Sequence, residues 1–301
     1  MVPQWFQSLF SYPYSPIKGR PLTLSVYNET KWARHKEIKA LPTPFYPRLY
    51  YLCIMRLAIH HIDHGGGIAI TILAIAIVAG VLLFAKGDKV GSYGDTAQQG
   101  IDVSHHQGYI DWKTVASEGT VKFAYIKATE GATHQDTRYD YNIAAARENG
   151  IKVGSYHYFH PDVPVKEQAE NFLHITCAYP QDLVPAIDIE ECGGMSPQQI
   201  CDSIAYFASL LQEQWHALPL IYTHQKFYNR YLQNSFNEYP LWIARYGFFL
   251  IKPRPQLEDD RTPDVWQYSN RGKVNGIKGR VDLNALRGTI KLNDLELVKQ
   301  I

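Results

Sequence analysis

Two acids, Asp188 and Glu190, end an apolar run that has the composition of a buried strand, in the segment Val184-Pro-Ala-Ile-Asp-Ile-Glu190. Side chains alternate along a strand, so the two acids face one side while Ile187 and Ile189 face the other. Two carboxylates on a buried strand are costly to ionise at the same time. Such a pair is typical of acid–base chemistry, and we expect it to act on a glycosidic bond.

From residue 99 onward, apolar runs alternate with helical stretches and predict the scaffold that positions these acids. Strands are expected at residues 100–104, 121–127, 151–158, 183–190, 218–222, 241–245, 265–268 and 279–282. Helices are expected at residues 139–149, 165–177 and 196–215, the last beginning with an N-cap serine and a proline. Repeated strand–helix units predict a parallel sheet, and eight strands favour closure. The predicted fold is α/β, an irregular TIM-like (β/α) barrel over residues 99–290 with reduced helices after the fifth strand.

In such barrels the active site lies at the carboxyl ends of the strands. The polar and aromatic residues expected there are Asp102, Lys127, Tyr156, Asp188, Glu190, Tyr222, Trp242, Gln267, Tyr268 and Asp282. Aromatic faces stack on sugar rings, while carboxylates protonate a leaving oxygen and stabilise a positively charged ring. No phosphate loop, zinc spacing or serine elbow competes with this set, so it favours a sugar site.

Seven pieces of the sequence carry a family resemblance, and they occur in order between residues 100 and 284. They are GIDVSHHQGYIDW (100–112), YIKATEG (125–131), GSYHYF (154–159), PAIDIE (185–190), PLWIARY (240–246), WQYS (266–269) and GRVDLN (279–284). In them the chain resembles the glycoside hydrolase family 25 lysozymes, or N-acetylmuramidases. The resemblance implies a peptidoglycan hydrolase that cuts the β-1,4 bond between N-acetylmuramic acid and N-acetylglucosamine. It does not cover the first 98 residues, and we see no wall-binding repeats after it.

The resemblance also implies roles for single residues. Glu190 would be the general acid, with a pKa raised by Asp188 and by burial, while Asp188 would stay ionised and orient the 2-acetamido group of the substrate. Asp102 and Asp282 would line the same pocket. The expected substrate-binding residues are Tyr156, Tyr222, Trp242, Gln267, Tyr268 and Lys127. No metal or cofactor is expected.

Purely structural roles remain as alternatives for several of these residues. Asp102 could bond to neighbouring backbone, and Asp282 could cap a turn. The aromatic residues could belong to the barrel core, and Lys127 could form an ion pair with Glu130. Ser104 beside a histidine is better interpreted as a strand-end hydroxyl than as a nucleophile.

Residues 66–85, GGIAITILAIAIVAGVLLFA, contain no charge and have the length of one transmembrane helix. Lys and Arg are more numerous before this segment than just after it, which places the N-terminus in the cytoplasm. A cleaved signal peptide is the alternative, although the run is long for one and has a poor cleavage site. We expect a single-pass protein of the bacterial inner membrane, with the barrel on the periplasmic or extracellular side beyond a linker at residues 86–98.

Residues 1–65 form a basic head without regular periodicity, and translation could instead start at Met55. The cluster of His60, His61, Asp63 and His64 is better interpreted as a solvated turn than as a metal site. Residues 291–301 are expected to form a C-terminal tail.

Charge and cysteine content limit the remaining functions. Residues 1–98 carry ten Lys and Arg against five Asp and Glu, whereas residues 99–301 carry 20 against 24. The acidic barrel argues against nucleic acid as a partner. Cys192 and Cys201 could pair or remain free thiols. We expect a monomeric enzyme; a barrel that binds glycan without cleaving it, or a scaffold, is the alternative.

Overall fold

The computed structural model describes residues 73–79, 88–89, 99–247 and 254–297 of the chain. The chain divides into two compact units, residues 1–79 and 80–301. Residues 73–79 are helical, and within the described residues no helix has both the length and the apolar character needed to cross a membrane. Most of the predicted span at 66–85 lies outside the described residues, as do the head at 1–65, Met55 and the histidine cluster.

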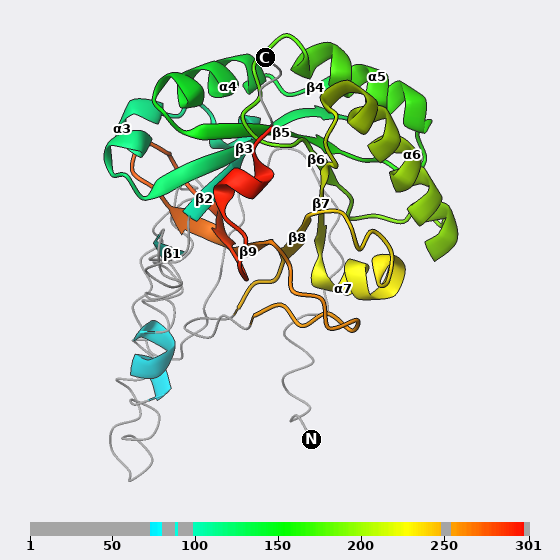
Figure 1. Ribbon diagram of the computed structural model, residues 1–301. Coiled ribbons are helices and arrows are strands. Elements are labelled where there is room, and N and C mark those ends of the chain that lie inside the picture. The colour runs from blue at the N-terminus through cyan, green and yellow to red at the C-terminus, as the bar shows by residue number, and fades with distance from the viewer. Residues whose placement is uncertain (1–72, 80–87, 90–98, 248–253, 298–301) are drawn as a thin grey trace, which may run out of the picture. The chain divides into compact units, whose positions relative to one another are not determined.

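The second unit contains a closed barrel of eight strands within the described residues (Figure 1). These are β2 (Gln99–Val103), β3 (Val121–Glu130), β5 (Lys152–Tyr158), β6 (Ala186–Asp188), β7 (Leu220–His224), β8 (Leu241–Ala244), β9 (Val265–Lys273) and β10 (Val281–Leu286). Each strand pairs with the next of these along the chain, and β10 closes the ring against β2. The predicted barrel is therefore confirmed.

The eighth strand departs from the parallel sheet that the sequence predicts. Strand β10 is antiparallel to both β9 and β2, whereas the pairs from β2 to β9 are parallel. Residues 274–280 join β9 to β10 without a helix, and so short a connection suits a hairpin, whose strands must run antiparallel.

Two further strands have two residues each. Strand β1 (Asp88–Lys89) pairs in parallel with the end of β9, and β4 (His134–Gln135) pairs with β3. The predicted linker at 86–98 therefore includes a segment that joins the sheet.

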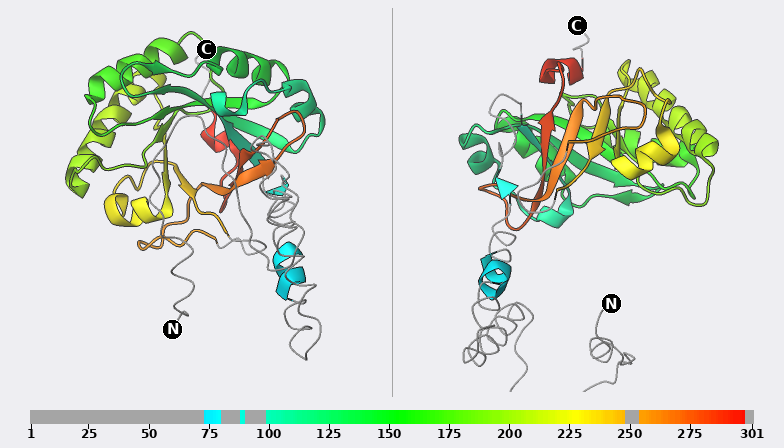
Figure 2. Two further views of the ribbon diagram at one scale, coloured as in Figure 1. Left: turned by 180° about the vertical axis from the view of Figure 1, so that it is seen from behind. Right: turned by 90° about the horizontal axis from the view of Figure 1, so that it is seen from below.

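Helices cover the outside of the first strands (Figures 1 and 2). They are α3 (Trp112–Ser117), α4 (Tyr139–Glu148), α5 (Val165–Thr176) and α6 (Pro197–Trp215). After β7 come only a short α7 (Gln225–Phe227) and a π-helical turn, η4 (Tyr228–Leu232). The predicted loss of helices after the fifth barrel strand is confirmed.

Local signals place the helix ends. In the capping box of α6, Ser196 Oγ accepts from the Gln199 N–H and Gln199 Oε1 accepts from the Ser196 N–H at 2.9 Å. Helix α4 stops before Gly150, whose φ of 81° lies in the left-handed region that glycine tolerates.

The barrel strands separate two apolar layers. Outward side chains such as Ile101, Val153 and Ile221 pack against the helices, where Phe207 and Leu211 of α6 are fully buried. Inward side chains, among them Phe123, form a second cluster inside the barrel.

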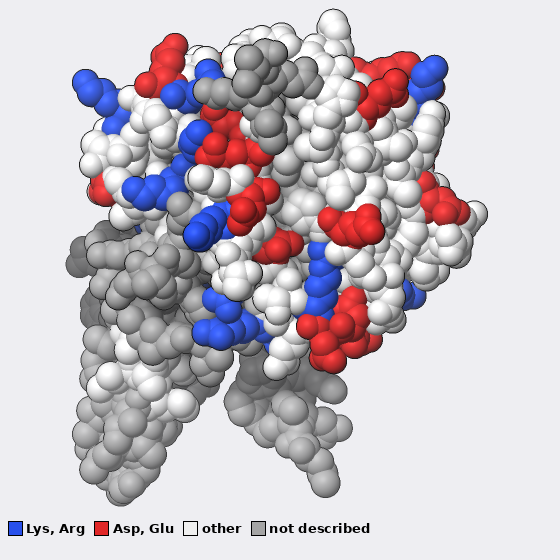
Figure 3. Space-filling model, viewed as in Figure 1, with Lys and Arg blue, Asp and Glu red and all other residues white. Residues whose placement is uncertain are grey.

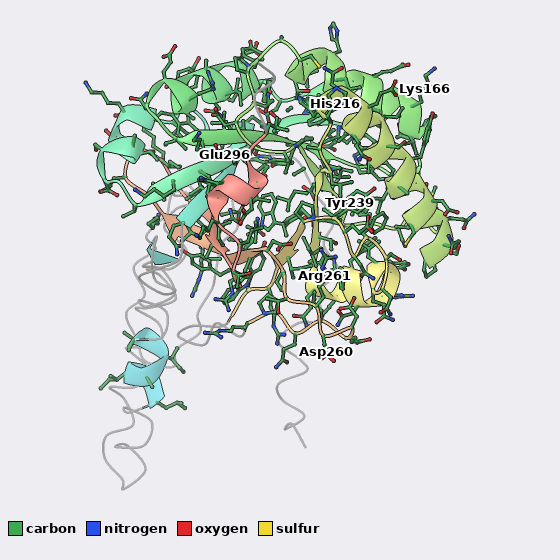
Figure 4. The ribbon with its side chains drawn as sticks, viewed as in Figure 1. Lys166, His216, Tyr239, Asp260, Arg261 and Glu296 are labelled. Atoms are coloured by element: carbon green, nitrogen blue, oxygen red, sulfur yellow. The ribbon has the colours of Figure 1, made fainter. Side chains whose placement is uncertain are left out.

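The C-terminal segment closes onto this inner cluster. Leu292 and Leu295 of η5 (Leu292–Leu295) are buried in it, and the Val184 N–H donates to the Leu295 carbonyl at 2.8 Å. Glu296 follows η5, and its Oε2 lies 3.2 Å from Lys152 Nζ (Figure 4). The predicted tail at 291–301 therefore begins within the folded domain.

The loop before β9 is fixed by Arg261. Its Nη1 donates to the Phe236 carbonyl at 2.8 Å, and its Nη2 donates to the carbonyl of Tyr239 (Figure 4). These bonds join the segment ahead of β9 to the segment ahead of β8, so strands without covering helices still have fixed connections.

Candidate active site

The four predicted acids all lie at or beyond the same end of the barrel strands. Asp102 is on β2, Asp188 is the last residue of β6, Glu190 follows two residues later, and Asp282 is on β10. Asp282 stands directly opposite Asp102 in the antiparallel ladder, so their Cβ atoms are about 5 Å apart. Asp102 and Asp188 are each 8% exposed, whereas Glu190 is half-buried.

Strand β6 is shorter than the predicted strand at 183–190, and this separates the two acids of the original pair. Pro185 has no N–H, and the Val184 N–H bonds to the C-terminal segment instead of to a barrel strand. At its carboxyl end the strand stops at Asp188, which pairs with Tyr158 and Tyr222 in the neighbouring strands, while Glu190 lies beyond the strand end and is more open to solvent.

Asp102 is fixed by two side-chain amides. Its Oδ2 accepts from Asn284 Nδ2 at 2.7 Å and from Gln267 Nε2 at 2.9 Å. Burial raises the pKa of Asp102 to about 6; the two hydrogen bonds oppose this shift, and the charge of Glu190 adds to it. Asp102 therefore bonds to side-chain amides, and not only to neighbouring backbone as the structural alternative had it.

Those two amides are oriented by further side-chain donors. Gln267 Oε1 accepts from the Tyr222 hydroxyl at 2.9 Å and from the hydroxyl of Tyr246. Asn284 Oδ1 accepts from Trp242 Nε1 at 2.9 Å. Since each amide oxygen has a donor, each amide nitrogen must face Asp102, and the carboxylate is held by a connected network.

Burial works against the expectation that Asp188 stays ionised. Burial raises its pKa well above the ordinary value, and the charges of Glu190 and Asp102 add to the rise, while Lys127 opposes it. Its Oδ1 is buried and has no hydrogen-bond partner among the described residues. The sheet removes this carboxyl from water, so a proton is harder to remove from Asp188 than from an exposed aspartic acid.

Asp282 also favours the protonated form. Burial raises its pKa to about 8, with further contributions from Asp102 and Glu190. Asp102, Asp188 and Asp282 therefore all hold a proton more tightly than an exposed aspartic acid does, because burial and neighbouring negative charge disfavour their ionised forms.

Lys127 is engaged by Glu130. The Lys127 Nζ lies 2.6 Å from Glu130 Oε2 and 5.0 Å from the centre of the Tyr158 ring. His160 Nε2 is 2.8 Å from the other oxygen of Glu130. Partial burial would raise the pKa of Glu130, but the hydrogen bonds from Lys127 and His160 hold it at about 2. The alternative of an ion pair is thus realised for Lys127, whose charge also acts on Asp188.

The aromatic residues lie at different depths. Tyr156 is half-buried, and burial raises its pKa well above the ordinary value, with Asp102 and Asp188 adding to the shift. Tyr222 and Trp242 are 6% and 2% exposed and pack edge to face, 4.6 Å between ring centres. They therefore support the floor of the site more than its walls.

Tyr268 is not brought into this group. It is 1% exposed, belongs to the outer apolar layer, and donates its hydroxyl to Gln99 Oε1 at 3.0 Å. It is adjacent to Gln267, which points inward, so strand alternation turns Tyr268 to the opposite face.

Three residues of the site were missed by the sequence reasoning: Tyr158, Tyr246 and Asn284. Alternation gives a signal for two of them, because Asn284 is two residues after Asp282 and Tyr158 is two residues after Tyr156. Tyr246 follows β8 in a loop, where no periodicity fixes its direction.

Other candidate sites receive no support within the described residues. No cluster of three or more His, Cys, Asp or Glu side chains with metal-binding geometry occurs there. Cys177, Cys192 and Cys201 are free thiols. Lys and Arg are interspersed with Asp and Glu on the face in Figure 3, which carries no continuous basic patch.

Comparison with known proteins gives consistent matches over the barrel. The model of the glycosyl hydrolases family 25 matches residues 101–277. The Escherichia coli K12 protein YegX, described as uncharacterized, is 37% identical over 64% of this chain and 70% of its own. An autolytic lysozyme of Clostridium acetobutylicum is 37% identical over 62% of this chain and 55% of its own. A solved family 25 glycosyl hydrolase from Bacillus anthracis has a TM-score of 0.59 and 30% identity, covering 65% of this chain and 92% of that one.

Proposed function

Because the chain belongs to the glycosyl hydrolases of family 25, we propose that it is a peptidoglycan hydrolase of the lysozyme type. The bond cut is the β-1,4 linkage between N-acetylmuramic acid and N-acetylglucosamine. The observation that carries this proposal is the convergence of four acids at one end of the barrel, three of them with raised pKa values and one of these, Asp102, held by an amide network. A glycan-binding barrel without activity would not need several buried acids, which are costly to keep.

Glu190 acts as the general acid in this mechanism. It is half-buried, so it can reach a glycosidic oxygen, and it lies close enough to Asp188 and Asp102 to raise the pKa of both. It gives its proton to the departing sugar oxygen as the bond breaks.

Asp188 orients the 2-acetamido group of the substrate. Its unpartnered Oδ1 is a buried acceptor, and the acetamido N–H is a donor of the right kind. A hydrogen bond to the carboxylate favours its ionised form, so substrate binding lowers the pKa of Asp188 and favours its carboxylate. The ionised Asp188 then stabilises the positive charge as the acetamido oxygen attacks the anomeric carbon.

Asp102 and Asp282 complete the electrostatic environment. Asp102 is fixed by Asn284 and Gln267 and cannot rotate away without breaking two hydrogen bonds. Its charge lies near Asp188 and Asp282 and raises the pKa of both carboxyl groups.

The test is digestion of purified peptidoglycan by the full chain, with soluble muropeptides identified by mass spectrometry. We expect release by the wild type and a loss of about 10²–10⁴-fold for Glu190→Gln, as for removal of a general acid. The matched control is Glu213→Gln, which changes an exposed acid on α6, away from the site. Binding without release would favour the glycan-binding alternative, neither binding nor release would favour a scaffold, and full activity of Glu190→Gln would refute its assignment.

We also propose that residues 66–85 anchor the chain in the bacterial inner membrane, with the N-terminus in the cytoplasm and the barrel outside. The uncharged twenty-residue run and the excess of Lys and Arg before it support this location. All four acids come from one chain, which supports a monomer. Protease treatment of spheroplasts carrying a C-terminal tag tests the topology, and protection of the tag would refute it.

A further inference from the structure

Beyond the four acids, an exposed aromatic cluster lies at the same end of the barrel. The Tyr109 and Tyr141 rings are 5.5 Å apart at an interplanar angle of 75°, and the Arg138 guanidinium lies 3.7 Å from the centre of the Tyr109 ring. Tyr109 is 65% exposed and Tyr141 is 40% exposed, although large apolar rings are usually covered. We call these three residues the rim platform.

The chain segments that carry the rim platform are connected to the strands that carry two of the acids. Tyr109 follows β2, the strand of Asp102, by six residues, and it precedes α3. Gln107, in the same loop, donates its Nε2 to the Arg280 carbonyl at 3.1 Å, and Arg280 is two residues before Asp282. The loop therefore reaches from the end of β2 to the start of β10, the two strands that bring Asp102 and Asp282 together.

A buried carboxylate makes this platform rigid. Asp136 is 5% exposed, and its Oδ2 accepts from the His105 N–H at 2.9 Å and lies 2.7 Å from His105 Nδ1. Its Oδ1 accepts from the Arg138 N–H at 2.9 Å. Asp136 thus joins the loop after β2 to the N-terminal end of α4, the helix that contains Tyr141.

The platform combines exposed aromatic rings with a guanidinium group, a combination that suits a ligand with both an apolar ring face and a negative charge. The Tyr141 hydroxyl donates to the Ile110 carbonyl at 2.7 Å, which fixes this ring while leaving part of it open. Arg138 forms no ion pair with any described residue, so its charge is available. Stacked sugar rings suit the exposed ring of Tyr109, and a carboxylate suits the guanidinium edge of Arg138.

We propose that the rim platform binds a second, peptide-bearing sugar unit of the glycan strand that occupies the acid site. Its ligand class is an amino sugar with an acidic peptide attached, stacked on Tyr109 with a peptide carboxylate on Arg138. This proposal rests on the proposed function, since the same strand fills both sites. The platform makes cleavage of long, peptide-bearing strands more efficient than cleavage of short ones.

The test compares three substrates: intact peptidoglycan, glycan strands freed of peptide by an amidase, and a peptide-free tetrasaccharide of the same sugars. For each variant of the full chain, kcat/KM on the two polymers is divided by kcat/KM on the tetrasaccharide. Tyr109→Ala is expected to lower both ratios about five- to twentyfold through KM, and Arg138→Met is expected to lower only the ratio for intact peptidoglycan, about threefold or more. The matched control is Tyr206→Ala, which removes a 48% exposed tyrosine from α6.

Unchanged ratios in Tyr109→Ala, or the same loss on all three substrates, would overturn the rim platform as a binding site. If the wild type cleaves none of the substrates, the proposed function has failed, and co-sedimentation with insoluble peptidoglycan then decides the platform alone. In that case equal binding by the wild type and Tyr109→Ala overturns it, while weaker binding by Tyr109→Ala alone supports it. Circular dichroism and thermal unfolding of each variant separate lost binding from lost folding.

Discussion

The outward and inward faces of the barrel strands place their side chains in very different surroundings. On β6, Ile187 is fully buried in the apolar layer beneath the helices, whereas the next residue, Asp188, is buried among charges. On β9, Trp266 belongs to the outer layer while Gln267 bonds to Asp102. One strand therefore contributes to stability with one face and to chemistry with the other.

This division shows where the fold tolerates unfavourable electrostatics. The inward face contains acids with raised pKa values and an unpartnered carboxylate oxygen, all of which lower stability at neutral pH. The outward face buries large apolar side chains, which offset that cost. Substitutions on the inward face should therefore lower activity, and substitutions on the outward face should lower stability.

The largest expected effect comes from Asp188→Asn on the inward face. The amide cannot carry the negative charge that orients the acetamido group and stabilises the charged ring. We expect kcat on peptidoglycan to fall about 10²–10³-fold, as for loss of an electrostatic stabiliser. The free energy of unfolding should not fall, because a buried acid is removed. A variant that keeps full activity, or that unfolds more readily at pH 7, would contradict the contrast between the faces.

The next effect is on the outward face, one residue away. Ile187→Ala removes a fully buried side chain, and we expect the free energy of unfolding to fall by about 2–4 kcal/mol. Activity per folded molecule should stay close to the wild type below the unfolding transition. Denaturant unfolding and initial rates at 20–25 °C measure both, with Ile187→Val as a graded control. A hundredfold loss of kcat would show that the faces are not separable at β6.

A smaller effect concerns Asp282 and pH. Its folded-state pKa of about 8 lies above the ordinary value, so the folded protein holds a proton that the unfolded chain releases, and stability is lost as pH rises from about 4 to 8. Asp282→Asn removes this loss, and its gain in unfolding free energy should grow to about 1–3 kcal/mol by pH 8.

Denaturant titrations at several pH values check this prediction for Asp282. Glu213→Gln, which changes an exposed acid on α6, serves as the control and should follow the wild type. A constant difference between Asp282→Asn and the wild type across this range would show that Asp282 titrates as an ordinary surface acid.

The smallest effect compares two tyrosine hydroxyls. Tyr222→Phe removes a donor to Gln267, which lies in the Asp102 network, and activity should fall about five- to tenfold, the worth of one hydrogen bond. Tyr268→Phe removes the bond to Gln99 in the outer layer and should cost about 1 kcal/mol of stability without changing kcat. A loss of kcat in Tyr268→Phe, with no loss in Tyr222→Phe, would instead favour Tyr268 as a substrate-binding residue.

Much of the barrel could be predicted from residue patterns because the signals are local. The serine, proline and glutamine at the start of α6 and the glycine after α4 fix helix ends through bonds within a few residues. Strand β6 was predicted too long, because the partner of the Val184 N–H is Leu295, more than a hundred residues away.

The sequence by itself determined that Asp102, Asp188, Glu190 and Asp282 belong to one site, since strand order and alternation place them at one end of the barrel. It also determined that Ile187 and Ile189 face away from these acids. Only the tertiary structure decided which acid is removed from water, that Gln267 and Asn284 hold Asp102, and that Tyr268 faces away. The physical reason is that pKa values and amide orientation depend on burial and on partners from distant strands, which no local pattern contains.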